Sequence, residues 1–162
     1  MISRSIRYIF ISVLLIIAQT KLMRFISLEG ITPDLLVIWV VYITVQRGQM
    51  SGTIWGFAIG LFYDLSVGNF IGLSAFSKTI AGFTAGYFYD EQRTSMTLGT
   101  YRFLIVILIV SFIHNIFYFI IYTRGTETGI LGAVLEVGLA TTCYTAVVAL
   151  LPMFFFARKF VK

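Results

Sequence analysis

Five polar residues within the apolar stretches of the sequence are the first candidates for chemistry: Asp64, Lys78, His114, Asn115 and Glu136. Carboxylate, ammonium and imidazole groups can carry protons, bind a ligand or pair with one another. In a bilayer a charged side chain costs about 2.5–3.5 kcal/mol on insertion scales, so it usually faces the interior of a helix bundle or a cavity. We therefore treat these five residues as the candidate intramembrane polar site.

Asp64 and Lys78 flank a predicted turn at residues 66–72. Asp64 ends the helix before the turn, and Lys78 lies about one and a half turns into the helix after it. A lysine stem is long enough to extend about one helical turn toward an interface. We therefore predict a structural salt bridge between Asp64 and Lys78, with binding of a partner or ligand by this pair as the alternative.

His114 and Asn115 are adjacent in the most hydrophobic stretch, which favours hydrogen bonding to another helix over a proton relay. Because the sequence has one histidine, and its single cysteine, Cys143, is not at ligand spacing, no metal site is predicted. Glu136 lies a few residues into the last apolar stretch, where a place near the outer headgroups is favoured over proton transfer. The sequence has no Gly-rich phosphate loop, zinc-protease histidine pair or serine nucleophile elbow, so we predict no enzyme, no catalytic residue and no cofactor.

The composition of the chain is that of a membrane protein. Hydrophobic residues make up 59% of the 162 residues, charged residues make up 12%, and the mean hydropathy is +0.94. A soluble domain averages about 25% charged residues. We therefore predict a single integral membrane domain over residues 1–162, in contact with the lipid bilayer. The net charge of +5 does not indicate nucleic-acid binding, because the basic residues lie in short connections and at the ends.

Apolar stretches predict an all-α bundle of six transmembrane helices at residues 6–22, 35–45, 50–65, 73–89, 103–122 and 130–156. No small-x-small cleavage site follows the first, so an uncleaved helix is favoured over a signal peptide. Pro33 is expected to open the second helix, with Asp34 in its first turn. That helix would be about 17 Å long against a hydrocarbon core of about 30 Å. The second and third helices therefore either extend to the interface or form a re-entrant hairpin.

Lysine and arginine are shared unevenly between the two sides of this arrangement. The side with both termini holds eight: Arg4, Arg7, Arg47, Arg93, Arg102, Arg158, Lys159 and Lys162. The other side holds three, Lys21, Arg24 and Arg124, while Lys78 lies within a helix. Cytoplasmic loops carry the excess of basic residues. We therefore expect a multi-pass protein with both termini in the cytoplasm.

Glycines recur every four residues at Gly48, Gly52, Gly56 and Gly60, and a second series of small residues includes Gly82 and Gly86. In water each glycine would cost a helix about 1 kcal/mol relative to alanine. In a bilayer, small residues four apart form a smooth stripe that lets two helix backbones approach closely. These glycines therefore predict a packing surface, either between the third and fourth helices or with a partner.

Short motifs carry a resemblance that covers essentially the whole chain. In order they are Gly-Ile-Thr-Pro-Asp-Leu-Leu with Pro33 and Asp34, Val-Gln-Arg-Gly with Arg47, Gly-Leu-Phe-Tyr-Asp-Leu with Asp64, and Gly-Leu-x-Ala from Gly72. In these motifs and their spacing the sequence resembles the rod shape-determining protein MreD family. The resemblance implies a small multi-pass protein of the bacterial inner membrane, similar in fold to the substrate-binding subunits of energy-coupling-factor transporters.

Membership of that family would make the protein a non-enzymatic scaffold of the cell-elongation machinery, with a role in rod shape and lateral peptidoglycan synthesis. The implied partners are the single-span protein MreC, MreB, RodA and a penicillin-binding protein. The alternative is a substrate-binding membrane subunit of a vitamin-type transporter. Such subunits carry an Ala-x-x-x-Ala type motif on the first helix, whereas residues 6–22 contain a single alanine, Ala18. A proton-coupled carrier is least favoured, because no internal repeat is visible.

Overall fold

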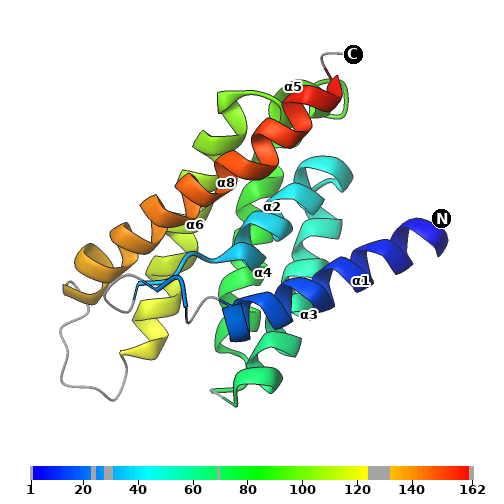
Figure 1. The fold of residues 1–162 in the computed structure, drawn as a ribbon. Helices are drawn as coiled ribbons and strands as arrows, with labels where there is room; N and C mark the ends of the chain where they lie inside the picture. Colours follow the sequence, from blue (N-terminus) through cyan, green and yellow to red (C-terminus); the bar gives the residue numbers. More distant parts are fainter. Residues whose placement is uncertain (1, 23–24, 28–30, 69, 124–131, 161–162) are drawn as a thin grey trace.

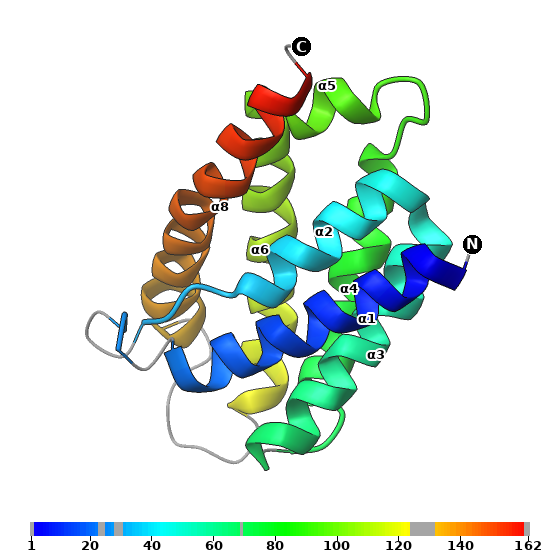
Figure 2. The same cartoon turned by 45° about the vertical axis from the view of Figure 1, so that its right-hand side comes forward.

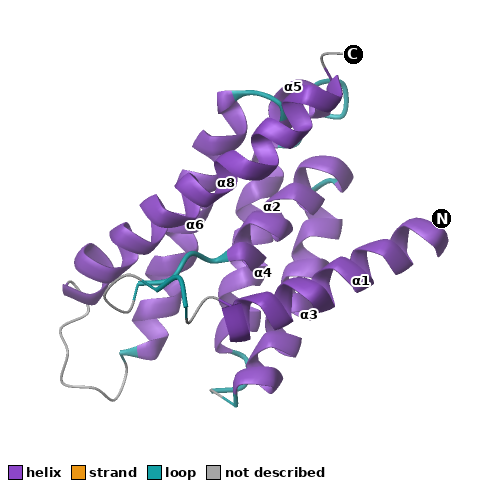
Figure 3. Cartoon of the chain, viewed as in Figure 1, coloured by secondary structure: helices purple, strands orange, loops and turns teal. Residues whose placement is uncertain are grey.

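Every regular element of the described residues is a helix, which confirms the predicted all-α class (Figure 3). The structure, a computed structural model, describes residues 2–22, 25–27, 31–68, 70–123 and 132–160. In chain order the elements are α1 (Ile2–Ile17), the π-helix η1 (Ala18–Leu22), α2 (Leu35–Arg47), α3 (Gln49–Val67), α4 (Leu73–Ala85), the 3-10 helix η2 (Gly86–Phe88), α5 (Thr94–Leu98), α6 (Tyr101–Tyr122), the π-helix η3 (Ala133–Gly138) and α8 (Leu139–Phe160).

Helix α2 lies at the centre of the bundle. Its side chains at Leu36, Val37, Val40, Val41 and Ile43 are fully buried, and it contacts α1, α3, α4, α6 and α8. Figure 2 shows α1 running across the front of the bundle, with α4 and α6 behind α2. A helix that is hydrophobic on all sides needs cover on all sides. For the short apolar run at residues 35–45, neighbouring helices of the same chain provide that cover.

A single residue, Gly48, joins α2 to α3. Its φ of 87° lies in the region that favours glycine, and its N–H donates to the carbonyl oxygen of Thr44 (2.8 Å). Beside this joint the Arg47 guanidinium lies 4.9 Å from the centroid of the Tyr8 ring on α1. Gly48 therefore turns the chain, and the glycine stripe proper begins one helical turn later, at Gly52.

Helices α3 and α4 form a close hairpin along the glycine stripe. A Cβ atom at Gly56 would fall on the backbone carbonyl of Lys78, and one at Gly60 on the backbone of Ala75. From the other side, a Cβ at Gly82 would fall on the carbonyl of Gly52, and Gly86 lies against Gln49. Backbone thus meets backbone at Gly56, Gly60 and Gly82, whereas Gly52 lies against the Thr44 side chain on α2 and Gly86 against the Gln49 side chain.

Two helical stretches within the described residues are long and apolar enough to cross a membrane: Tyr101–Tyr122, which is α6, and Val134–Phe154. Figure 1 shows α8 running alongside α6. By the same measure Leu35–Arg47 is apolar but shorter. Two candidate spans are compatible with a membrane protein, and the number of spans stays a prediction.

Some element boundaries differ from the sequence-based expectation. The connection at residues 92–100 contains a short helix, α5, that its polar sequence did not indicate. The fourth helix ends at Ala85 and continues as one 3-10 turn, and the last begins as the π-helix η3. Pro152 lies inside α8. None of these differences moves the residues of the candidate site.

Candidate functional site

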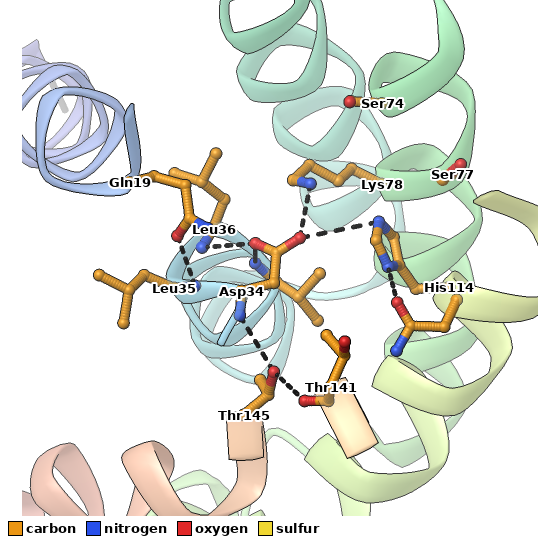
Figure 4. Close-up of polar contacts among 12 residues, drawn as sticks. Gln19, Asp34, Leu35, Leu36, Ser74, Ser77, Lys78, His114, Thr141 and Thr145 are labelled. Atoms are coloured by element: carbon orange, nitrogen blue, oxygen red, sulfur yellow. Dashed lines mark hydrogen bonds and ion pairs between the residues drawn. The ribbon is translucent and has the colours of Figure 1, made fainter. Parts of the chain in front are cut away.

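The head of α2 is a buried polar centre, shown in Figure 4. Asp34 is the N-cap of this helix, and its Oδ1 accepts hydrogen bonds from the backbone N–H groups of Leu36 (2.9 Å) and Val37 (3.0 Å). A capping carboxylate satisfies N–H groups that lack partners within the helix and lies at the positive end of its dipole. The expectation that Pro33 opens the helix is wrong, since the helix begins at Leu35.

Two segments far apart in the chain hold the head of α2. Gln19, in η1, accepts a hydrogen bond from the Leu35 N–H at Oε1 (3.0 Å) and donates from Nε2 to the carbonyl oxygen of Pro33 (3.0 Å). From α8, the Thr145 hydroxyl accepts a hydrogen bond from the Asp34 N–H (3.0 Å) across 111 positions of sequence. The end of the first helix and the last helix are therefore tied to the same turn.

Lys78 pairs with Asp34, and the predicted salt bridge between Lys78 and Asp64 is wrong. The Lys78 Nζ donates to Oδ2 of Asp34 at 2.8 Å, with the two side chains 3% and 16% exposed. The same ammonium lies 5.3 Å from the centroid of the Tyr63 ring, which is within range of a cation–π interaction. Lys78 thus joins α4 to α2 and α3, rather than closing the α3–α4 hairpin.

Asp64 binds backbone instead of a side-chain cation. Its carboxylate accepts hydrogen bonds from the N–H groups of Gly72 (2.9 Å), Ser74 (3.0 Å) and Ala75 (3.2 Å). The residue is 1% exposed. These are the N–H groups at the start of α4, which lack partners within that helix. Asp64 therefore fixes the turn between α3 and α4 by capping α4 from the preceding helix.

His114 and Asn115 lie on α6, facing the same polar centre. Asn115 donates from Nδ2 to the carbonyl oxygen of Gly138 (3.0 Å) and to the Thr142 hydroxyl (2.9 Å), which joins α6 to η3 and α8. The Nδ1 atom of His114 lies 3.3 Å from the Asn115 side-chain oxygen. Its Nε2 atom is 3.9 Å from Oδ2 of Asp34 and has no hydrogen-bond partner among the described residues.

These groups line a cavity of about 190 Å³. The lining residues are Gln19, Thr32, Asp34, Tyr63, Ser74, Lys78, His114, Asn115, Tyr118, Phe119, Val137 and Thr141. Gln19 follows the end of α1, and Thr141 lies near the start of α8, so the cavity is at the ends of these helices that are farthest from the two termini. Outside this set, Glu136 is exposed on η3 and does not line the cavity.

The carboxylate, ammonium and amide groups that line the cavity already take part in structural bonds. Asp34 uses one oxygen for the cap and the other for Lys78. The Nε2 atom of His114 remains, and a buried polar atom without a partner costs about 1–3 kcal/mol. Among the described residues no three His, Cys, Asp or Glu side chains are grouped to hold a metal ion. The cavity can therefore receive one small polar group that donates to or accepts from His114.

Comparison with known families identifies the chain. The family described as rod shape-determining protein MreD matches residues 3–162. The chain belongs to the MreD family. Members of this family take part in determining rod shape. Comparisons with curated proteins and with solved structures gave no match.

The motif residues that carried the MreD resemblance have distinct positions in the structure. Asp34 caps α2 and binds Lys78, Asp64 caps α4, and Gly72 precedes α4 with a φ of 103°. Arg47, by contrast, lies at the opposite end of α2, over Tyr8. The two aspartates of the motif thus organise the beginnings of two neighbouring helices.

Sequence reasoning missed several residues of the site, among them Gln19, Tyr63 and Thr145. Gln19 is a single amide beside a long apolar stretch, and Tyr63 and Thr145 have no charged residue three or four positions away. A usable signal existed for Gln19, since an amide in an otherwise apolar helix needs a partner in its surroundings. Nothing in the spacing indicated Thr145, because its bond to Asp34 depends on how the last helix packs.

Proposed function

We propose that the chain is a non-enzymatic scaffold of the bacterial cell-elongation machinery that binds MreC in the inner membrane. The family match over residues 3–162 carries this proposal. In it, the chain positions MreC relative to MreB, RodA and a penicillin-binding protein, and so contributes to rod shape and lateral peptidoglycan synthesis. The dense bonding around Asp34 supports a rigid holding role, because its polar atoms bind neighbouring helices.

The size of the polar cavity supports partner binding over transport. Sites for drug-sized small molecules usually measure about 300–1,000 Å³, whereas this cavity measures about 190 Å³. A cavity of about 150 Å³ holds a molecule the size of benzene. One side chain of a partner fits such a space, with a polar atom placed against His114. We propose that a segment of MreC fills it.

The second candidate is the substrate-binding subunit of a vitamin-type transporter, similar in fold to those of energy-coupling-factor transporters. The polar lining of the cavity favours it, since a ligand site needs a few convergent polar groups. The cavity, at about 190 Å³, is smaller than the sites that hold most drug-sized ligands, which argues against binding of a whole vitamin. Equilibrium binding of candidate vitamins to the purified chain separates the two proposals, because the scaffold is expected to bind none of them.

Co-purification with MreC tests the proposed function. Thr141 lines the cavity from α8, so Thr141→Trp is expected to fill it and to lower recovery of tagged MreC at least about tenfold, a loss of about 1.4 kcal/mol. The matched control is Val147→Trp on the same helix, whose side chain is 60% exposed outside the cavity. Equal recovery with both variants would place the contact elsewhere, and no recovery with the unaltered chain would contradict the scaffold itself.

We further propose that α1, α2, α3, α4, α6 and α8 each cross the membrane, with both termini in the cytoplasm. The eight basic residues on the side of the termini support this orientation. In a Cys143→Ser background, a cysteine at Thr94 is expected to resist an impermeant thiol reagent in intact cells. A cysteine at Thr126, which lies outside the described residues, is expected to react. Reaction at both positions would exclude the six-span arrangement.

A further inference from the structure

Two neighbouring cavities share a pair of arginines at the junction of α5 and α6. The larger, of about 600 Å³, is lined by Arg93, Met96, Thr100, Tyr101 and Arg102. The smaller, of about 280 Å³, is lined by Phe88, Asp90, Arg93, Thr97, Arg102, Ile105 and Val106. Arg93 and Arg102 line both cavities, so the two arginines lie where the cavities adjoin.

The two arginines keep most of their capacity to bind an anion. Arg93 has its Nε 3.7 Å from a carboxylate oxygen of Asp90, and these side chains are 62% and 50% exposed. An ion pair this exposed contributes little, because water and salt screen it. Arg102 is exposed and pairs with no carboxylate among the described residues. A planar guanidinium suits the oxygens of a phosphate group.

An apolar wall continues from the arginines along α6. Ile105 and Val106 follow Arg102 by about one helical turn and line the smaller cavity together with Phe88. The side chain of Ile105 is 45% exposed, and α6 is one of the two candidate membrane spans. At the rim, Met96 and Tyr101 are 65% and 63% exposed. The charged pair therefore has apolar surface along α6 and the exposed side chains of Met96 and Tyr101 at its edge.

We propose that this junction binds an anionic phospholipid. The phosphate of the headgroup lies between Arg93 and Arg102, and an acyl chain lies along Phe88 and Ile105. Charge complementarity and the apolar wall together require one molecule with both an anionic head and a hydrocarbon tail. Basic pockets beside membrane helices recognise anionic headgroups in this way. This site is separate from the cavity at Asp34, and its occupation does not depend on MreC.

Lipid retention measured on the intact chain tests the proposal. The full-length protein is incorporated into nanodiscs of phosphatidylglycerol and phosphatidylcholine in equal amounts with identical chains, then released and weighed by native mass spectrometry. We expect the unaltered protein to be enriched in phosphatidylglycerol. Each single variant, Arg93→Gln or Arg102→Gln, is expected to reduce this enrichment about fivefold. The matched control is Arg47→Gln, which removes the same charge from a guanidinium that lines neither cavity.

The outcomes of this experiment are distinct. Loss of enrichment in the double variant, with Arg47→Gln unchanged and thermal unfolding midpoints alike, supports the site. An equal loss with Arg47→Gln would overturn it, since general attraction to charge would then suffice. Displacement of the lipid by millimolar inorganic phosphate would also overturn it, because the apolar wall would contribute nothing. If the double variant does not purify in folded form, the two single variants decide the question.

Discussion

Replacing Asp34 with asparagine is expected to destabilise the protein by about 3–5 kcal/mol, the cost of leaving one charge of a buried pair without its partner. Asparagine can still cap α2 through its side-chain oxygen, so the loss falls on Lys78. That ammonium would keep the Tyr63 ring as its neighbour but lose the carboxylate at 2.8 Å. Reversible unfolding in mixed detergent micelles measures the difference.

The converse variant, Lys78→Met, is expected to cost less than Asp34→Asn. Asp34 would retain the N–H groups of Leu36 and Val37, which stabilise its charge. Combining both changes is expected to restore most of the stability, because Lys78→Met removes the charge that Asp34→Asn would leave buried without a partner. The matched control combines Asp64→Asn with Lys78→Met. It is expected to be no more stable than Lys78→Met alone, because Asp64 does not pair with Lys78. Rescue by Asp64→Asn would mean that Lys78 pairs with Asp64 after all.

Replacing Gly56 with alanine is expected to cost about 3 kcal/mol, near the upper end of the range for overpacking, and leucine more. The new Cβ would meet the backbone carbonyl of Lys78, which cannot move aside as a flexible side chain can. Helices α3 and α4 would have to separate, and the ion pair of Lys78 would shift with them. Detergent unfolding and the yield of folded protein are the measurements.

Gly132→Ala is the matched control for the glycine stripe. Gly132 has a helical φ of −62° and no atom within 4 Å of the position of a Cβ. Alanine there is expected to be neutral or to stabilise the helix by up to about 1 kcal/mol. If Gly56→Ala has the same stability as Gly132→Ala in detergent unfolding, the backbones of α3 and α4 are not in contact at Gly56.

The helices were predictable because hydrophobic stretches and glycine spacing are local properties of the sequence. The α3–α4 packing followed from Gly56, Gly60 and Gly82 for the same reason. The partner of Lys78 was not predictable from spacing. The carboxylates of Asp64 and Asp34 each accept hydrogen bonds at the start of a helix, α4 and α2 respectively, and Asp34 is 44 positions from Lys78 in sequence. Choosing between them required knowing that Asp64 is used by the N–H groups of α4.

The short second helix was ambiguous for a different reason. An apolar run of this length can cross a locally thinned bilayer, enter the bilayer and return on the same side, or lie buried among other helices. Composition is the same in all three cases, because hydrocarbon and protein interiors select the same side chains. The structure shows that neighbouring helices of the chain cover this run around Val37 and Val41, and whether it also crosses the bilayer stays a prediction.

Synthesis delivers the residues around Asp34 to the membrane at different times. Lys78 emerges 44 residues after Asp34, whereas Thr145 emerges 111 residues after it. The ion pair can therefore form during translation, while the Asp34 N–H stays without its hydroxyl partner until α8 has been synthesised. A chain truncated before Thr145 would carry that unpaired donor permanently. Closing this one hydrogen bond therefore requires α8, and a chain that ends before Thr145 is expected to lose about 1–3 kcal/mol for the donor left unpaired.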